Sequence, residues 1–311
     1  MSARTIGLIV GGLILAIGSR ILFPNISLHV SVAAEPLFFI TEGIPFTNAV
    51  LVTIIVDIFL IVMAFMAASK LQLVPRGLQN VVEMIIEALV KLFQGINATY
   101  ARRAFPVLGT IFLFVIFANL FGLLPGFGSI GLCRSHAEEG EQHGSLAMAG
   151  PLSSVSPALA AAGESDYSPY IGCDPGESLV PLFRSPSADL NMTLALSLIS
   201  VVMIEYFGFS ALGPGYLKKF FNFSGPIPFF VGILELVSEI ARIPAFMFRL
   251  FGNIFAGEVL LVVMIFLVPF GLSIPFYGFE VFVSFIQAFV FAVLTMAFIS
   301  IAVTSHDDGH H

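Results

Sequence analysis

The sequence predicts an all-α integral membrane protein with five to six membrane helices, and composition is the first reason. Hydrophobic residues make up 58% of the 311 residues, and charged residues make up only 11%. A soluble domain usually carries about 25% charged residues. The mean hydropathy of the chain is +1.00. So few charges cannot cover the surface of a soluble globule of this size, and a disordered chain or a coiled coil is excluded as well.

The second observation is a set of apolar stretches with the length of membrane spans. A helix needs about 20 apolar residues to cross the hydrocarbon core. Five long stretches meet this requirement, namely residues 47–69, 105–125, 189–214, 226–270 and 272–305. The segment 226–270 is roughly twice the required length. It must therefore tilt steeply, lie partly along the membrane, or break into pieces.

A sixth, shorter apolar stretch covers residues 5–19 and follows Arg4. It resembles the apolar part of a signal peptide, but the small residues at 32–34 lie far beyond it for a cleavage site. We expect residues 1–34 to form an uncleaved anchor or signal-like segment, with the membrane domain over 35–311.

The distribution of Lys and Arg predicts the orientation in the cell (inner) membrane. The loops 70–104 and 215–225 carry basic residues, so both are expected in the cytoplasm. The segment 126–188 is poor in basic residues and rich in Gly, Ser, Ala and Pro. It is expected outside the cytoplasm, as an irregular insertion. The C-terminus, two long helices further on, is then expected in the cytoplasm.

Net charge and cysteines limit the possible partners. The formal net charge is −7 and there is no basic run, so no nucleic-acid partner is expected. Cys133 and Cys173 lie in one polar loop and form no metal motif. A disulfide between them and two free thiols are both open. No cofactor and no metal are expected.

Ionisable residues inside the spans are the third observation, because each costs about 2.5–3.5 kcal/mol at a helix centre. Arg249 lies deep in the segment 226–270, between aromatic and aliphatic residues. At about 100° per residue, four other polar residues fall within about 40° of it on the helix surface. These residues are Glu235, Ser238, Arg242 and Asn253.

Two further groups of polar residues lie away from the helix face that Arg249 and these four residues share. Glu258 follows Arg249 by nine residues, which places it about 180° away around the helix. In the last segment, Glu280, Ser284 and Gln287 share one face. For Glu235, Glu239 and Arg242, a local ion pair or helix-end anchor is as well supported as a functional role. A structural role is favoured for Asp57, Glu83, Glu87 and Glu205, which stand alone or near ends.

The chemistry of these side chains suggests a barrier between two polar paths. Arg does not lose its proton in a protein, so it cannot carry protons, but it can block them. Glu can carry a proton when burial favours its neutral form. Glu258 with Gln287 and Glu280 fits one path, and Glu235 with Ser238 fits a second path from the other side of the membrane.

Four motifs in order resemble subunit a of the F-type ATP synthase, the membrane stator subunit beside the rotor ring. These are NLFGLLPGF at 119–127, SPSADLNMTLAL at 185–196, RLFGNIFAGE at 249–258 and QAFVFAVLT at 287–295. The resemblance covers most of residues 40–305. The segment 126–188 is longer than the family leads us to expect, and Glu280 stands where some members have His.

The resemblance implies a role for each matched residue. Arg249 would face the rotor carboxylate and separate the two half-channels. Glu235 and Ser238 would belong to the cytoplasmic half-channel. The outside half-channel would contain Glu258, Asn253, Glu280 and Gln287, with Asp189 and Asn191 at its mouth. The last two helices would lie steeply tilted as a hairpin against the ring.

The resemblance also implies that the chain is not catalytic by itself, and the sequence contains no GxxxxGK[ST] nucleotide motif. The expected partners are rotor c-ring subunits, peripheral-stalk b subunits, the rest of the complex and the lipid bilayer. The translocated ion is a proton or Na⁺, with a proton as the default. An ion-coupled secondary transporter is the alternative, although the chain has no internal repeat. A structural scaffold and an intramembrane protease are weaker alternatives, and the protease motifs HExxH and GxSxG are absent.

Overall fold

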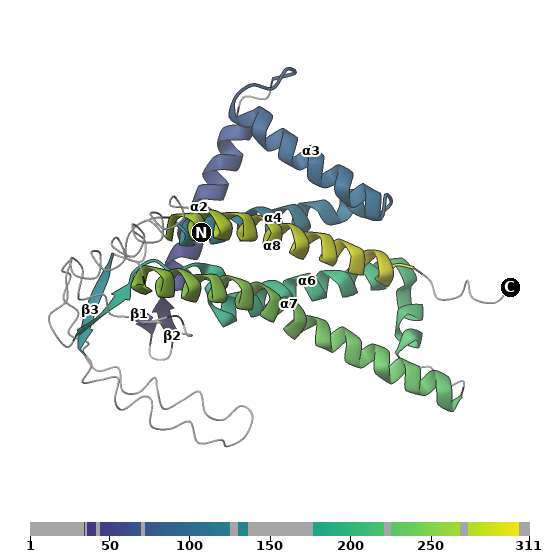
Figure 1. Cartoon of the computed structure of the whole chain (residues 1–311). Helices are drawn as coiled ribbons and strands as arrows, with labels where there is room; N and C mark the ends of the chain where they lie inside the picture. The colour runs from purple at the N-terminus through teal and green to yellow at the C-terminus, as the bar shows by residue number, and fades with distance from the viewer. Residues whose placement is uncertain are drawn as a thin grey trace, which may run out of the picture.

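The computed structural model describes residue 34 and the ranges 36–41, 44–69, 72–124, 130–135, 177–220, 225–267 and 273–304. Within these ranges the chain is mainly helical (Figure 1), and the predicted all-α membrane fold is confirmed. Five of the helices are long and apolar enough to cross a membrane. They are α2 (Asn48–Ala68), α4 (Ala101–Gly122), α6 (Leu190–Leu212), α7 (Pro226–Leu267) and α8 (Ser273–Ala302). The anchor expected over residues 1–34 lies outside the described residues apart from Ala34.

Helix α7 is continuous over its 42 residues, although Pro244 lies inside it. At about 1.5 Å per residue it is about 63 Å long, roughly twice the thickness of the hydrocarbon core. Of the three possibilities that the sequence left open, a break is wrong for residues 226–267. The apolar length must instead be accommodated by tilt or by a course along the membrane surface.

Helix α3 (Leu78–Ile96) was not expected from the sequence, where it falls within a basic loop. Three charged residues, Glu83, Glu87 and Lys91, interrupt its apolar positions and hide it from a search for long apolar runs. The Lys91 ammonium lies 2.7 Å from Glu87 on the exposed face, and this contact holds the pKa of Glu87 below its ordinary value. Leu89 and Phe93 are buried on the opposite face, so α3 is amphipathic.

Two short antiparallel hairpins were also not expected. Strands β1 (Pro36–Thr41) and β2 (Ile44–Thr47) pair directly before α2. Strands β3 (Gly131–Ser135) and β4 (Glu177–Pro181) pair across the polar segment, with Gly131 opposite Pro181 and Ser135 opposite Glu177. The two ends of that segment therefore meet. The pairing of Cys133 with Cys173 that the sequence leaves open lies outside the described residues, because Cys173 is not among them.

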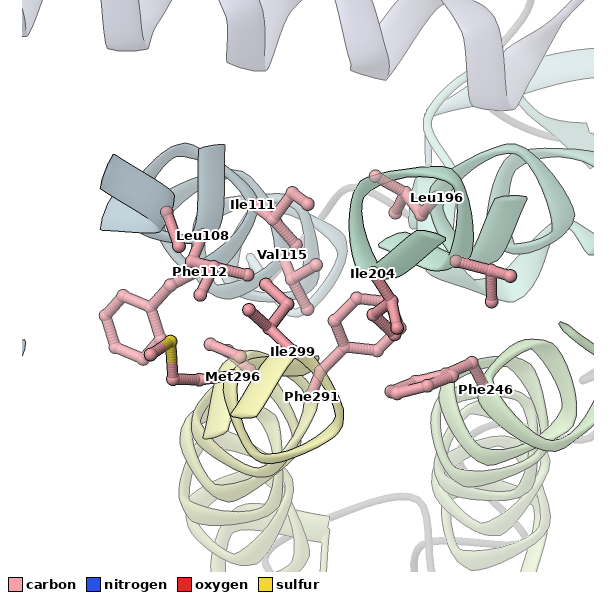
Figure 2. Packing of buried hydrophobic residues seen from close by; sticks show 14 of the residues in the cluster. Leu108, Ile111, Phe112, Val115, Leu196, Ile204, Phe246, Phe291, Met296 and Ile299 are labelled. Atoms are coloured by element: carbon pink, nitrogen blue, oxygen red, sulfur yellow. The ribbon is translucent and has the colours of Figure 1, made fainter. Parts of the chain in front are cut away.

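The hydrophobic core lies where α4, α6, α7 and α8 face one another. Figure 2 shows side chains from the four helices pointing into this space. Val115 of α4, Ile204 of α6 and Phe291 of α8 are almost completely buried. Phe246 of α7 contacts Phe291, with 5.0 Å between their ring centroids. This packing fixes the positions of α7 and α8, on which most of the predicted site residues lie.

The ends of the helices define two sides of the bundle. At one end α4 finishes, α6 begins, α7 finishes and α8 begins (left in Figure 1). A 3₁₀ turn, η3 (Pro186–Ala188), and the β3–β4 hairpin lie at this end. At the other end lies a second 3₁₀ segment, η4 (Gly213–Lys219), which follows α6 and leads towards α7.

Candidate functional site: polar residues between the long helices

Arg249 lies on the outer surface of α7. Its side chain is exposed, whereas Phe246 and Leu250 on the same helix are buried against the bundle. The guanidinium carbon is 5.8 Å from the centroid of the Phe246 ring. Among the described residues no acidic side chain forms an ion pair with Arg249. The permanent positive charge therefore lies on a face of α7 that the described residues leave exposed.

Gln287 joins α8 to α7 at the level of Arg249. Its Nε2 atom donates a hydrogen bond to the backbone oxygen of Arg249 at 3.1 Å. Its Oε1 atom accepts one from Nδ2 of Asn253 at 3.2 Å. Gln287 is buried, and Asn253 is exposed on the same side of α7 as Arg249. The structure thus brings together Arg249, Asn253 and Gln287. Spacing had predicted Arg249 beside Asn253, and the family resemblance had implied Asn253 with Gln287.

Glu258 lies about one and a half turns beyond Asn253, and its ion-pair partner comes from outside α7 and α8. Its Oε2 atom is 3.4 Å from Nη2 of Arg184, in an ion pair where Arg184 is 5% exposed and Glu258 37%. The arginine comes from the chain just before η3. Glu258 and Arg249 therefore belong to different surroundings, as their angular separation predicted.

Glu280 packs against α7 beside Glu258. A Cβ atom placed on Gly257 would collide with the carboxylate of Glu280. The missing side chain of Gly257 therefore makes the space in which this carboxylate lies. Glu280, Ser284 and Gln287 are all buried, so the face of α8 predicted from their spacing is the face that contacts the bundle. Ser284 Oγ is buried without a hydrogen-bond partner among the described residues.

Asp189 and Asn191 lie at the start of α6. Asp189 is the N-cap of this helix, and its Oδ1 atom accepts a hydrogen bond from the backbone N–H of Asn191 at 3.0 Å. Asp189 is buried, whereas the side chain of Asn191 is exposed. An N-cap carboxylate satisfies an otherwise unpaired helix N–H, so Asp189 has a structural role whatever else it does.

The residues of the second predicted path lie on the first half of α7. Glu235 is half-buried and Ser238 is exposed. They precede Arg249 by fourteen and eleven residues, or about 21 and 16 Å along the helix axis. The neighbouring Glu239 forms a close ion pair with Arg242, so the local pair considered for these two residues is present. The structure therefore keeps this group apart from Glu258 and Glu280.

Sequence reasoning missed Arg184, which it counted only as a charge in an outside loop. Its position directly before the SPSADLN motif was an available signal. The structure buries it together with Ser185, Ser187 and Asp189, at the end of the bundle where α4 and α7 finish. Asn119 of α4 is buried at this end as well, with no hydrogen-bond partner among the described residues for either side-chain atom.

Fold and site together define a class: a multi-pass helical membrane protein with an exposed arginine on α7 between two separate sets of polar residues. The sequence matches the ATP synthase A chain family over residues 49–300. The chain belongs to this family. It is accordingly the ion-channel subunit of an ATP synthase and is not catalytic by itself.

Individual relatives agree with the family match. The chain is 34% identical over 264 residues to ATP synthase subunit a of Gloeobacter violaceus, covering 85% of this chain and 86% of that protein. Subunit a of Helicobacter pylori (strain G27) is 30% identical over 248 residues, covering 78% and 84% of the two chains. Subunit a of Campylobacter jejuni (strain RM1221) is 28% identical over 261 residues, covering 82% and 89%.

Proposed function

We propose that this subunit conducts protons through two half-channels at its contact with the rotor c-ring of an F-type ATP synthase. Arg249 separates the half-channels and faces the rotor carboxylate. The observation that carries the proposal is the exposure of Arg249 on an apolar helix face, with no acidic partner among the described residues. Such a charge is unfavourable against lipid, so a partner with a carboxylate fits this face.

The outside half-channel contains Glu258, Glu280, Asn253 and Gln287, with Asp189 and Asn191 at its mouth. An ion passes these residues and neutralises a rotor carboxylate, which can then enter lipid at much lower cost than its charged form. The Arg184–Glu258 pair and the contact of Glu280 with Gly257 support a polar region at this end.

The cytoplasmic half-channel contains Glu235 and Ser238. After nearly a full turn of the ring, the rotor carboxyl loses its ion there. The driving force is about 2.3 kcal/mol per charge for each 100 mV, in addition to any concentration gradient. The separation of about 16–21 Å between these residues and Arg249 along the helix supports two paths instead of one continuous pore.

The same proposal covers domains, partners and orientation. Residues 35–311 form the membrane domain, with an extracytoplasmic insertion at about 126–188, and residues 1–34 form an anchor or signal-like segment. The protein works in the cell (inner) membrane with c-ring, peripheral-stalk b and other ATP synthase subunits. A cytoplasmic C-terminus is supported by the hydrogen bond from Asn97, in the basic loop 70–104, to Ser300 near the end of α8, at 3.1 Å.

The test is Arg249→Ala in the assembled complex, reconstituted in vesicles. Proton-driven ATP synthesis should be lost while the ring and the catalytic subunits still copurify. The control is Arg102→Ala, which removes an exposed arginine outside the site and should leave synthesis normal. Normal synthesis by the Arg249 variant would refute the proposal, and solute uptake by the isolated chain in liposomes would favour a secondary transporter.

A further inference from the structure

A second group of ionisable side chains lies between α6, η4 and α7, on the side of α7 that faces the bundle. The carboxyl of Glu205 on α6 lies beside the carboxyl of Glu239 on α7 and the hydroxyl of Tyr216 on η4. Arg242 on α7 forms a close ion pair with Glu239 and also faces Glu205. Glu239 and Tyr216 are buried, and Glu205 and Arg242 are half-buried. We name these four residues the cytoplasmic cluster.

Aromatic rings lie against the cytoplasmic cluster. The centroid of the Tyr216 ring lies 4.9 Å from that of Phe209 and 5.5 Å from that of Phe220. The centroid of the Phe298 ring, on α8, lies 4.4 Å from the guanidinium carbon of Arg242. Glu205 Oε1 is buried in the structure. The charges therefore lie in surroundings of low polarity, where an uncompensated charge is costly.

The cytoplasmic cluster contains two carboxyl groups but only one positively charged side chain. Arg242 stays positive at any relevant pH, and Glu239 is sufficient to balance it. Glu205 adds a second carboxyl, and two adjacent carboxyls resist being ionised together. A purely structural ion pair would be complete without Glu205. One bound proton makes the cluster neutral, and loss of that proton leaves one negative charge.

We propose that Glu205 and Glu239 share one exchangeable proton and form the group through which the cytoplasmic half-channel releases and takes up protons. This inference rests on the proposed function and extends the half-channel beyond Glu235 and Ser238. It also replaces the structural role that sequence reasoning favoured for Glu205. The proton leaves the rotor carboxyl by breaking its O–H bond and binds a carboxylate oxygen of the cluster. It then passes to a cytoplasmic water molecule, and the cluster returns to its charged form.

The surface of α7 offers a polar connection between the exposed side that carries Arg249 and this cluster. At about 100° per residue, Ser238, Arg242, Glu235 and Glu239 follow one another within about 100° of arc. Along that arc the side chains change from exposed at Ser238, through half-buried at Arg242 and Glu235, to buried at Glu239. Glu239 precedes Arg249 by ten residues, or about 15 Å, so the cluster lies well away from the barrier.

The experiment compares Glu205→Gln with the unmodified chain in the assembled complex. Vesicles are prepared with the ATP-hydrolysing side outward, and the rate of ATP-driven proton pumping is measured against external pH. Gln keeps the size and polarity of the side chain but binds no proton. We expect pumping to fall at least about tenfold at neutral pH, which is within the usual contribution of a positioned proton-transfer group.

The pH profile separates proton transfer from a structural role. Without a stored proton, uptake depends directly on protons in the medium, so the rate should fall about tenfold for each rise of one pH unit, whereas the unmodified complex is less steep. Glu205→Asp should restore most of the rate and the shallow profile. Glu87→Gln, at an exposed glutamate outside the cluster, is the matched control.

A normal rate and profile for Glu205→Gln would overturn the inference, and so would a lower rate with an unchanged profile. If this variant fails to assemble, Glu239→Gln gives the same test, because Glu205 is then left as the permanent partner of Arg242. The Arg249→Ala result is independent of these outcomes. Loss of synthesis in Arg249→Ala together with a normal Glu205→Gln profile would reject the cluster and leave the two half-channels standing.

Discussion

Two arginines in this apolar chain, Arg184 and Arg249, lie in opposite surroundings. Arg184 is almost fully buried, and its ion pair with Glu258 places a positive and a negative charge at the same end of the bundle. Arg249, in contrast, is exposed and has no acidic partner among the described residues. The two arginines therefore have different consequences: one compensates a carboxylate within the chain, and the other is available to a partner.

Replacing Arg184 with Gln should weaken both stability and ion conduction. Glu258 would keep a half-buried carboxylate without its cation, at a cost of about 1–2 kcal/mol, reduced from the usual cost of breaking a buried pair because Glu258 is partly exposed. We expect ATP synthesis by the assembled complex to fall, with a lower thermal midpoint. Arg102→Gln is the control. In a double-mutant cycle with Glu258→Gln, strictly additive losses would show that the two side chains do not interact.

The contact between Gly257 and Glu280 makes a second prediction at this scale. In Gly257→Ala the new methyl group would occupy the place of the Glu280 carboxylate, which must move because it is the flexible end of its side chain. Ion conduction should fall while the fold is retained. Combining this change with Glu280→Asp shortens the acidic side chain and should recover part of the lost proton pumping. Equal pumping by the single and double variants would contradict this explanation.

Helices are the scale at which sequence reasoning worked best. The apolar runs predicted all five described spanning helices, because a membrane helix must bury its backbone polar groups within a long apolar segment. The same criterion missed α3, whose charges lie on one face, and the two hairpins, whose strands are only four to six residues long. Angular spacing correctly predicted that Arg249 and Asn253 share one side of α7 and that Glu280, Ser284 and Gln287 share one face of α8. The structure adds that the first side is exposed and the second face is buried.

Contacts between helices and distant loops could not be predicted, because spacing within one helix contains no information about them. The pairing of Arg184 with Glu258 spans 74 positions. Glu205 was assigned a structural role because it stands alone on α6, and only the packing of α7 and η4 against α6 places Glu239, Arg242 and Tyr216 around it. The functional roles of all the site residues remain predictions for experiment, namely those of Arg249, Asn253, Glu258, Glu280, Gln287, Asp189, Asn191, Glu235 and Ser238.

Close helix packing leads to a prediction about two glycines. A Cβ atom on Gly122, at the end of α4, would lie 2.9 Å from the backbone Cα of Ser185, which cannot rotate away. Gly122→Ala should therefore destabilise the protein by about 1–3 kcal/mol. A Cβ atom on Gly95 in α3 would meet nothing within 4 Å, so Gly95→Ala should be neutral or more stable by about 0.5 kcal/mol. Thermal unfolding in detergent compares the two, and equal midpoints would contradict the packing explanation.

At the scale of the whole molecule, the polar segment between α4 and α6 is the largest departure from a bundle of spanning helices. Its described ends pair as strands β3 and β4, and Ser135 lies opposite Glu177 at the last pair of the ladder. Paired antiparallel residues are separated by about 4.5–5.5 Å, a distance that a two-residue turn closes. The ladder therefore closes the base of this segment, and the geometry at its end does not require the residues in between.

Deleting residues 136–176 and joining Ser135 to Glu177 through Asn-Gly should preserve the fold and ion conduction. Asn-Gly is suited to the two-residue turn that this register needs. We expect the shortened chain to assemble with the ring and to support proton-driven ATP synthesis at a rate close to that of the full chain. The matched control deletes 131–181, which also removes β3 and β4 and with them the hydrogen bond from Asn48 to the backbone oxygen of Pro181 at 3.1 Å. If the shorter deletion abolishes synthesis in a complex that still assembles, the segment takes part in ion conduction and is more than an insertion.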